Sequence, residues 1–164
     1  TKPLDKSQHC LPWIIPDSKG ILKDVLHVLR RYEHCRDIIL LLTEKTPVSY
    51  IKYLEEREYD HYVVGHDHVD LRKALELVSQ RYGAKTITTD AGVTLNCQLL
   101  EQGLVDEISL LVSPVIVGNI SVDLFSKLHS PKGGLKLELI EQEVLENDCL
   151  WLLYRVRYER SCKK

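Results

Sequence analysis

The 164-residue sequence contains no methionine and no long apolar run. Because an initiator methionine is missing, Thr1 need not be the natural beginning of the protein. No apolar stretch approaches the roughly 20 residues that cross a bilayer, and residues 1–10 lack the apolar segment of a secretory signal. The sequence therefore predicts a soluble, cytoplasmic protein with no membrane partner.

An excess of basic charge is also absent. The chain has 22 Lys and Arg against 24 Asp and Glu, a formal net charge of −2 at pH 7. Proteins that bind nucleic acids need a positive field to neutralise phosphates, and this chain has none overall. We expect no nucleic-acid partner.

Disulfide and metal chemistry find little support. The five cysteines are widely spaced and include no Cys-x-x-Cys pair, which argues against a disulfide framework or a zinc knuckle. His61, His66 and His68 lie near one another in sequence, but no further ligand type stands at a familiar spacing, so a solvated loop is favoured over a metal site. We predict no metal. The cysteines are Cys10, Cys35, Cys97, Cys149 and Cys162.

Apolar periodicity predicts alternating strands and helices as far as Gly103. Short connections between such units favour right-handed crossovers onto a parallel sheet covered by helices on both faces. Thr46 is expected to cap the second helix, with Pro47 as its first residue. The expected strands are 13–15, 37–43, 61–64 and 85–89, and the expected helices are 22–32, 47–58, 71–82 and one through 99–100 that ends at Gly103.

The pattern changes after Gly103. Residues 135–140 and 150–158 alternate apolar and polar side chains around a turn at 146–148, which predicts an antiparallel hairpin. The whole chain therefore predicts an α/β fold in three layers, with a mostly parallel central sheet closed by an antiparallel C-terminal hairpin. Between Gly103 and the hairpin we expect a strand at 105–112, an extended piece at 114–118, a short helix at 122–128 and a turn at 132–134.

Ligands of open α/β sheets bind beyond the carboxyl ends of the strands, which nominates the loops 16–20, 43–46, 65–68 and 89–96. The last loop is the most suggestive, because it leads into a helix whose first amides are unpaired and attract phosphate. Gly92 lets the backbone approach an anion, and Thr94 and Asn96 offer further hydrogen bonds. In the alternative interpretation, Asp90 and Thr94 only cap the helix and Gly92 eases a turn.

Residues 86–118 resemble the signature of the reductase domain of riboflavin biosynthesis, which has the dihydrofolate-reductase-like fold. That family shows a strand, Glu-Gly-Gly, a small residue with Thr-Leu, a helix, Gly-Leu-Val-Asp-Glu and a Pro-x-x-x-Gly turn. The segments Gly103–Glu107 and Pro114–Gly118 match it without change. The segment Pro12–Leu22 resembles the family's strand and Asp-Ser turn, and the register fits from about Leu11 to Tyr158.

The resemblance implies an NADPH-dependent reductase that converts the ribosyl group of a diaminopyrimidine ribose 5′-phosphate into a ribityl chain. The substrate is then a small molecule, and the protein is expected to be a homodimer. By the same resemblance, Asp90 lies near the substrate. The positions that match the family's cofactor-binding segments are Ser18, Gly65, Ala91, Gly92, Val93, Thr94 and Leu95.

The sequence departs from the family pattern in two places. Asp90-Ala91-Gly92 stands where the family has Glu-Gly-Gly, and nothing before Leu11 matches the family's first strand, with its Ser-Leu-Asp-Gly motif, or its first helix. We therefore expect residues 1–164 to form a single reductase-like domain without that N-terminal strand and helix. The alternative function is a truncated or inactive relative that serves as a nucleotide-binding or dimerisation module.

Overall fold

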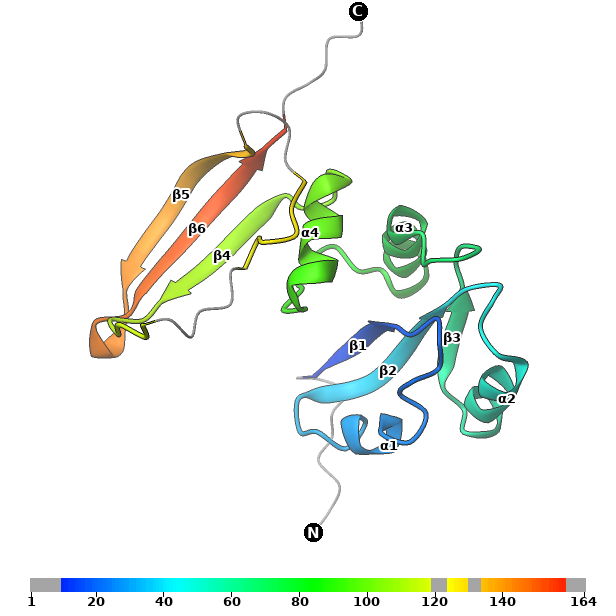
Figure 1. Ribbon diagram of the computed structural model, residues 1–164. Coiled ribbons are helices and arrows are strands. Elements are labelled where there is room, and N and C mark those ends of the chain that lie inside the picture. The colour runs from blue at the N-terminus through cyan, green and yellow to red at the C-terminus, as the bar shows by residue number, and fades with distance from the viewer. Residues whose placement is uncertain (1–9, 119–123, 130–133, 159–164) are drawn as a thin grey trace, which may run out of the picture. The chain divides into compact units, whose positions relative to one another are not determined.

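The computed structural model describes residues 10–118, 124–129 and 134–158. The chain divides into two compact units, residues 1–85 and residues 86–164, each described here by itself (Figure 1). Within the described residues, no helix is long and apolar enough to cross a membrane.

The first unit is a parallel sheet in the order β1-β2-β3. The central strand β2 explains the continuous apolar run in the sequence, because its last five residues are all buried. Its side chains alternate between the two faces of the sheet. The elements are β1 (Leu11–Pro16), α1 (Leu26–Leu29), β2 (Cys35–Leu42), α2 (Val48–Glu56), β3 (Asp60–Val63) and α3 (Leu71–Tyr82).

Helices cover both faces of this sheet. On one face, Leu40 and Leu42 of β2 pack in a core with Leu26 of α1 and Leu54 of α2. On the other, Leu41 packs with Ala74 of α3. The predicted layering of helices around parallel strands is therefore confirmed within this unit.

The predicted helix at 22–32 is wrong in length. Only the four residues of α1 are α-helical, and turns flank them. The amides of Ile21 and Leu22 hydrogen-bond to the carboxylate of Asp17, 3.0 Å away in each case, which ties the start of this segment to the preceding loop. The apolar stripe still packs on the core, because Leu26 is fully buried.

The second unit carries α4 (Val93–Glu101) and an antiparallel sheet in the order β4-β6-β5. The predicted hairpin is confirmed: β5 pairs with β6 through a turn in which Asn147 and Asp148 take left-handed backbone angles, φ 59° and 58°. The sheet consists of β4 (Glu107–Val112), β5 (Lys136–Val144) and β6 (Leu150–Arg157), with the short 3-10 helix η1 (Glu146–Asp148) before β6.

Two expectations for this half of the chain are wrong, those of a strand at 85–89 and of a short helix at 122–128, and one is confirmed. The predicted strand at 105–112 forms as β4, which pairs with β6 in the antiparallel sheet, whereas residues 85–89 form no strand. β-branched residues favour a strand only where a neighbouring strand pairs with them, and none of the described strands pairs with 85–89. Residues 124–129 make turns, while 122–123 and most of the predicted turn at 132–134 lie outside the described residues.

Candidate functional site

The carboxyl ends of β1 and β2 hold an unusual concentration of buried polar groups. Among the described residues, the buried polar or charged side chains are those of Asp17, Thr43 and Thr46, and all three lie in the loops that follow these two strands. Buried polar groups are costly unless they are hydrogen-bonded. This edge of the sheet is therefore held by a specific network and not by apolar packing alone.

Asp17 is the anchor of the first loop. Its carboxylate accepts hydrogen bonds from the amides of Ile21 and Leu22 and, at 2.8 Å, from the hydroxyl of Tyr50 on α2. The amide of Gly20 donates to the Asp17 carbonyl at 3.2 Å, closing a turn with Ser18 and Lys19 at its centre. Ser18 was predicted from the resemblance and Asp17 was missed, although an Asp before Ser-x-Gly commonly anchors a turn by accepting from the amides that follow.

Thr46 joins the second loop to the first. Its hydroxyl accepts a hydrogen bond from the amide of Thr43 at 3.0 Å and donates to the carbonyl of Ser18 at 2.9 Å. For this reason Thr46 does not cap α2, contrary to the sequence-based expectation, and Pro47 occupies the N-cap position. The half-buried Ser18 is thus held in place by the hydrogen bond that its backbone carbonyl accepts from Thr46.

Gly65 connects the third loop to the second. Its carbonyl accepts from the amide of Glu44 at 3.1 Å, and its φ of +114° lies where residues with a side chain rarely go. A Cβ there would stand 2.1 Å from the carbonyl oxygen of His68, so the turn requires glycine. Glu44 also pairs with His66 at 2.7 Å. Ser18 and Gly65, predicted from the resemblance, therefore belong to one hydrogen-bonded edge.

The remaining predicted residues lie in the second unit, at the start of α4. Gly92 is the N-cap residue, and no side chain caps the helix. Among the described residues, the helical hydrogen bonds begin with the amide of Asn96, 3.3 Å from the Gly92 carbonyl, which leaves the amides of Val93, Thr94 and Leu95 without a described partner. The alternative in which Asp90 or Thr94 caps the helix is therefore wrong.

The loop before α4 is shaped by its own polar side chains. The side-chain amide of Asn96 donates through Nδ2 to the Ala91 carbonyl at 2.7 Å. The backbone amide of Ala91 donates to the hydroxyl of Thr89 at 3.3 Å. Gly92 has a φ of −69°, and a Cβ built on it would meet nothing within 4 Å. The backbone does not require glycine here, and its missing side chain leaves the surface before the helix open. Asp90 is exposed beside it.

Lys127 brings a positive charge to the same helix end. Its Nζ lies 2.9 Å from the hydroxyl of Thr94, in the first turn of α4. Two turns later, Glu101 accepts from the backbone amide of His129 at 2.6 Å, and these hydrogen bonds from His129 lower the pKa of Glu101. The segment that contains Lys127 therefore runs along α4. Sequence reasoning missed Lys127, since nothing in the pattern relates it to Thr94, 33 residues away.

The three histidines singled out from the sequence do not gather. His66 pairs with Glu44, while Nδ1 of His61 lies 2.9 Å from the carbonyl of Tyr59. Across the part of the chain that the structure describes, no three His, Cys, Asp or Glu side chains are placed to hold a metal ion.

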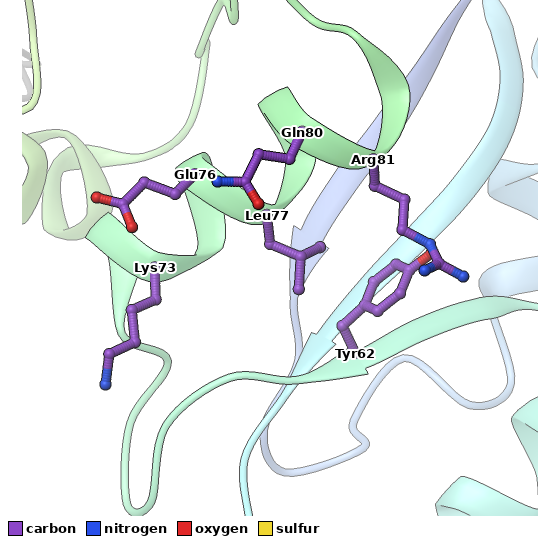
Figure 2. Close-up of a pocket in the computed structure, with 6 residues that line it drawn as sticks. All are labelled: Tyr62, Lys73, Glu76, Leu77, Gln80 and Arg81. Carbon is purple, nitrogen blue, oxygen red and sulfur yellow. The ribbon is translucent and has the colours of Figure 1, made fainter.

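An open hollow of about 470 Å³ lies between β3 and α3, lined in part by Tyr62, Leu77 and Arg81 (Figure 2). Arg81 lies over the Tyr62 ring and donates to its hydroxyl at 3.1 Å. Tyr82 donates to Asp60 at 2.9 Å, so the Tyr62 hydroxyl donates in turn to Tyr82. The polar groups at this end of the hollow bind one another, which favours a structural role.

Comparisons with known proteins identify the family. The model of the RibD C-terminal domain matches residues 2–151. The 2,5-diamino-6-ribosylamino-4(3H)-pyrimidinone 5′-phosphate reductase of Aquifex aeolicus is 33% identical over 84 residues, which is 51% of this chain and 37% of the relative. The chain thus matches little more than a third of that relative's length.

Solved structures share the fold. A pyrimidine reductase-like protein from Corynebacterium diphtheriae superposes with a TM-score of 0.70 at 16% identity, covering 90% of this chain and 62% of that protein. RibD from Acinetobacter baumannii gives 0.66 at 19% identity, covering 88% of this chain and 37% of that protein. These likenesses confirm the predicted dihydrofolate-reductase-like α/β fold. The match of the family model over residues 2–151 shows that the chain belongs to the RibD C-terminal domain family.

Proposed function

We propose that this chain is the reductase domain of a riboflavin-biosynthesis enzyme. In this proposal it uses NADPH to reduce the ribosyl group of a diaminopyrimidine ribose 5′-phosphate to a ribityl group. The family match over residues 2–151 carries the proposal. The A. aeolicus relative, named as a reductase of such a phosphate, supports the substrate class.

The start of α4 fits the diphosphate of a dinucleotide. Free amides at a helix N-terminus point outward and carry the positive end of the helix dipole, which attracts phosphate. The helix here has no side-chain cap, an open surface at Gly92 and the ammonium group of Lys127 at its first turn. In the proposal, Ala91 to Leu95 hold the diphosphate. Ser18 and Gly65, in the first unit, are cofactor-binding positions by the family resemblance.

The protein's part in the reaction is to bind and orient. NADPH, when bound, supplies a hydride for the sugar carbon. Asp90 is exposed beside the start of α4, and its carboxylate accepts hydrogen bonds from substrate hydroxyls in the proposal. Fixing the sugar in this way lowers the entropy lost in reaching the transition state.

Calorimetric titration with NADPH, with NADH in a parallel experiment, tests the proposal. We expect saturable binding of NADPH and, with the pyrimidine ribose phosphate added, oxidation of NADPH and formation of the ribityl product. In Lys127→Gln the affinity falls by up to about fivefold, as expected for the loss of one solvent-exposed ion pair with the diphosphate. The control is Lys136→Gln, which removes the same charge at the first residue of β5 and leaves the affinity unchanged. A folded chain that binds neither nucleotide overturns the proposal.

A second candidate is a nucleotide-binding module without turnover. Two departures from the family pattern favour it. Ala91 stands where the family has glycine, and the side chain of Asp90 is one methylene shorter than that of the family's glutamate. Saturable NADPH binding with no product formed from the pyrimidine substrate selects this second function. Turnover by the 164-residue chain excludes it.

We also propose a cytoplasmic homodimer. The antiparallel sheet exposes large apolar side chains, among them Leu111 (63% exposed) and Val144 (71%), and its edge strands β4 and β5 have no further described partner. Exposed edges and apolar patches favour association. Sedimentation at about twice the 18.9 kDa chain mass supports the dimer, and a single 18.9 kDa species at micromolar concentration contradicts it. The described cysteines are free thiols, as expected for a cytoplasmic protein.

A further inference from the structure

We propose that Tyr50 is a positioning residue: its hydrogen bond to Asp17 holds the loop 17–22 in the form that receives the nucleotide cofactor. This inference rests on the proposed function and adds to it a residue that does not itself contact the ligand. Ser18 and Lys19, at the centre of the turn, are the residues that the loop presents.

Tyr50 contacts the loop in two ways. Its hydroxyl donates to Asp17 Oδ2 at 2.8 Å, and its ring lies directly under Gly20, where a Cβ would stand 2.7 Å from the ring carbon Cγ. Tyr50 and Asp17 are each only 3% exposed. The loop backbone therefore rests on the ring and is fastened by the hydroxyl, with no space between them for water.

The hydroxyl is held neutral. Burial, followed by the hydrogen bond to Asp17, raises the pKa of Tyr50 well above its usual value. The phenol thus remains a donor, and the buried Asp17 carboxylate keeps three donors in total, two of them the amides of Ile21 and Leu22. Without the phenol, one oxygen of the Asp17 carboxylate loses a buried hydrogen-bond donor. The loop can then move so that water takes the place of the missing donor.

The second loop depends on the same arrangement. Thr46 donates to the carbonyl of Ser18, so a turn displaced at Asp17 also loses its link to the loop that follows β2. Tyr50 thereby acts on two of the loops at this edge from a buried position in the first turn of α2.

The chain offers a matched control one helical turn further along α2. Tyr53 stacks with Tyr50 at 6.2 Å between ring centroids, and its hydroxyl also donates to the segment before α1, to the carbonyl of Lys23 at 2.6 Å. That bond fastens the chain beyond the turn. Tyr50→Phe and Tyr53→Phe each remove one hydroxyl and keep the ring. The first removes a buried hydrogen bond to the Asp17 carboxylate, and the second removes an exposed one to a backbone carbonyl.

The experiment compares NADPH binding and amide hydrogen exchange in the wild type and the two variants. If the loop keeps its binding form for a fifth of the time without the phenol, the Kd of Tyr50→Phe rises about fivefold. The KM for NADPH rises with it, and kcat remains unchanged. The amides of Ile21 and Leu22 exchange faster in Tyr50→Phe and at the wild-type rate in Tyr53→Phe.

The outcomes separate the two proposals. A wild-type chain that does not bind NADPH overturns the proposed function, and this inference with it. A wild type that binds, together with Tyr50→Phe of equal affinity and equal exchange at Ile21 and Leu22, overturns the positioning role alone. An equal loss of affinity in Tyr53→Phe overturns it too, because the effect is then one of general stability. Should Tyr50→Phe fail to fold, Asp17→Asn, which keeps the side-chain size, takes its place and must show the same rise in KM.

Discussion

Replacing Gly65 with alanine should destabilise the first unit more than the same replacement at either of its other glycines, Gly20 and Gly83. Gly65 has a φ of +114°, and the added Cβ would lie 2.1 Å from the carbonyl oxygen of His68 and 2.9 Å from the amide nitrogen of Asp70. Both neighbours are backbone atoms, so no side chain can rotate away. Strained backbone costs about 1–3 kcal/mol, and overpacking typically adds about as much. We expect a loss of about 3 kcal/mol or more in the free energy of unfolding.

Urea denaturation followed by circular dichroism measures this loss, and thermal unfolding should show a decrease in Tm of roughly 10 °C for a chain of this size. Gly83→Ala is the control, since Gly83 also has a positive φ, +65°, but a Cβ there meets nothing within 4 Å. It carries only the left-handed backbone cost of about 1–2 kcal/mol. Equal losses in the two variants would refute the account of Gly65 as a packed turn.

Three further predictions follow. Arg30→Lys costs about 1 kcal/mol in the free energy of urea unfolding, because lysine cannot make a bidentate ion pair with Asp37. The two N···O distances of that pair are 2.7 and 2.9 Å. The control, Arg155→Lys, alters an exposed single contact at 3.4 Å and should cost less. Burial raises the pKa of Tyr82 above its usual value of 10.0. The stability due to the neutral phenol is therefore present below about pH 10 and is lost as the pH rises above it. The urea midpoint of Tyr82→Phe should fall less steeply than that of the wild type from about pH 9 to about pH 11. Gly92→Ala should change stability by less than about 1 kcal/mol but weaken NADPH binding in calorimetry, because the methyl group stands before the first amides of α4; unchanged affinity would contradict this.

Strands β1 to β3 and helices α2 and α3 were predictable because their signals are local. The apolar run of β2 has the length and composition of a strand covered on both faces, and the stripe of α3 ends at Gly83, whose left-handed φ of +65° closes the helix. The hairpin was equally clear, because β5 and β6 alternate around a polar turn. Each of these elements could be recognised from residues that are neighbours in sequence.

The failures have the opposite character. Residues 85–89 have strand-forming side chains but no described strand beside them, and pairing cannot be read from one segment. Thr46 has the composition of a helix cap, yet its hydroxyl is used by Ser18, 28 residues earlier. In both cases a contact with a distant segment, missing or present, decides against the local preference. Segment 22–32 has a helical stripe, but turns flank the four α-helical residues Leu26–Leu29, and the contacts of this segment do not explain why the helix is so short.

The candidate site divides in the same way. Gly65 and the residues around Gly92 could be nominated from glycine placement and from the family resemblance. Of the supporting groups, Asp17 could have been found from its Asp-Ser-x-Gly turn, whereas Tyr50 and Lys127 could not, because each binds a residue about 30 positions away in sequence.

Nuclear magnetic resonance of the backbone amides during a titration with NADPH tests the central claim most directly, since it reports on the start of α4 residue by residue. We predict that the largest changes in chemical shift fall on the amides of Val93, Thr94 and Leu95, with saturation at the calorimetric Kd. Saturable binding that leaves these three amides unmoved, or no binding by the folded chain, would contradict the account.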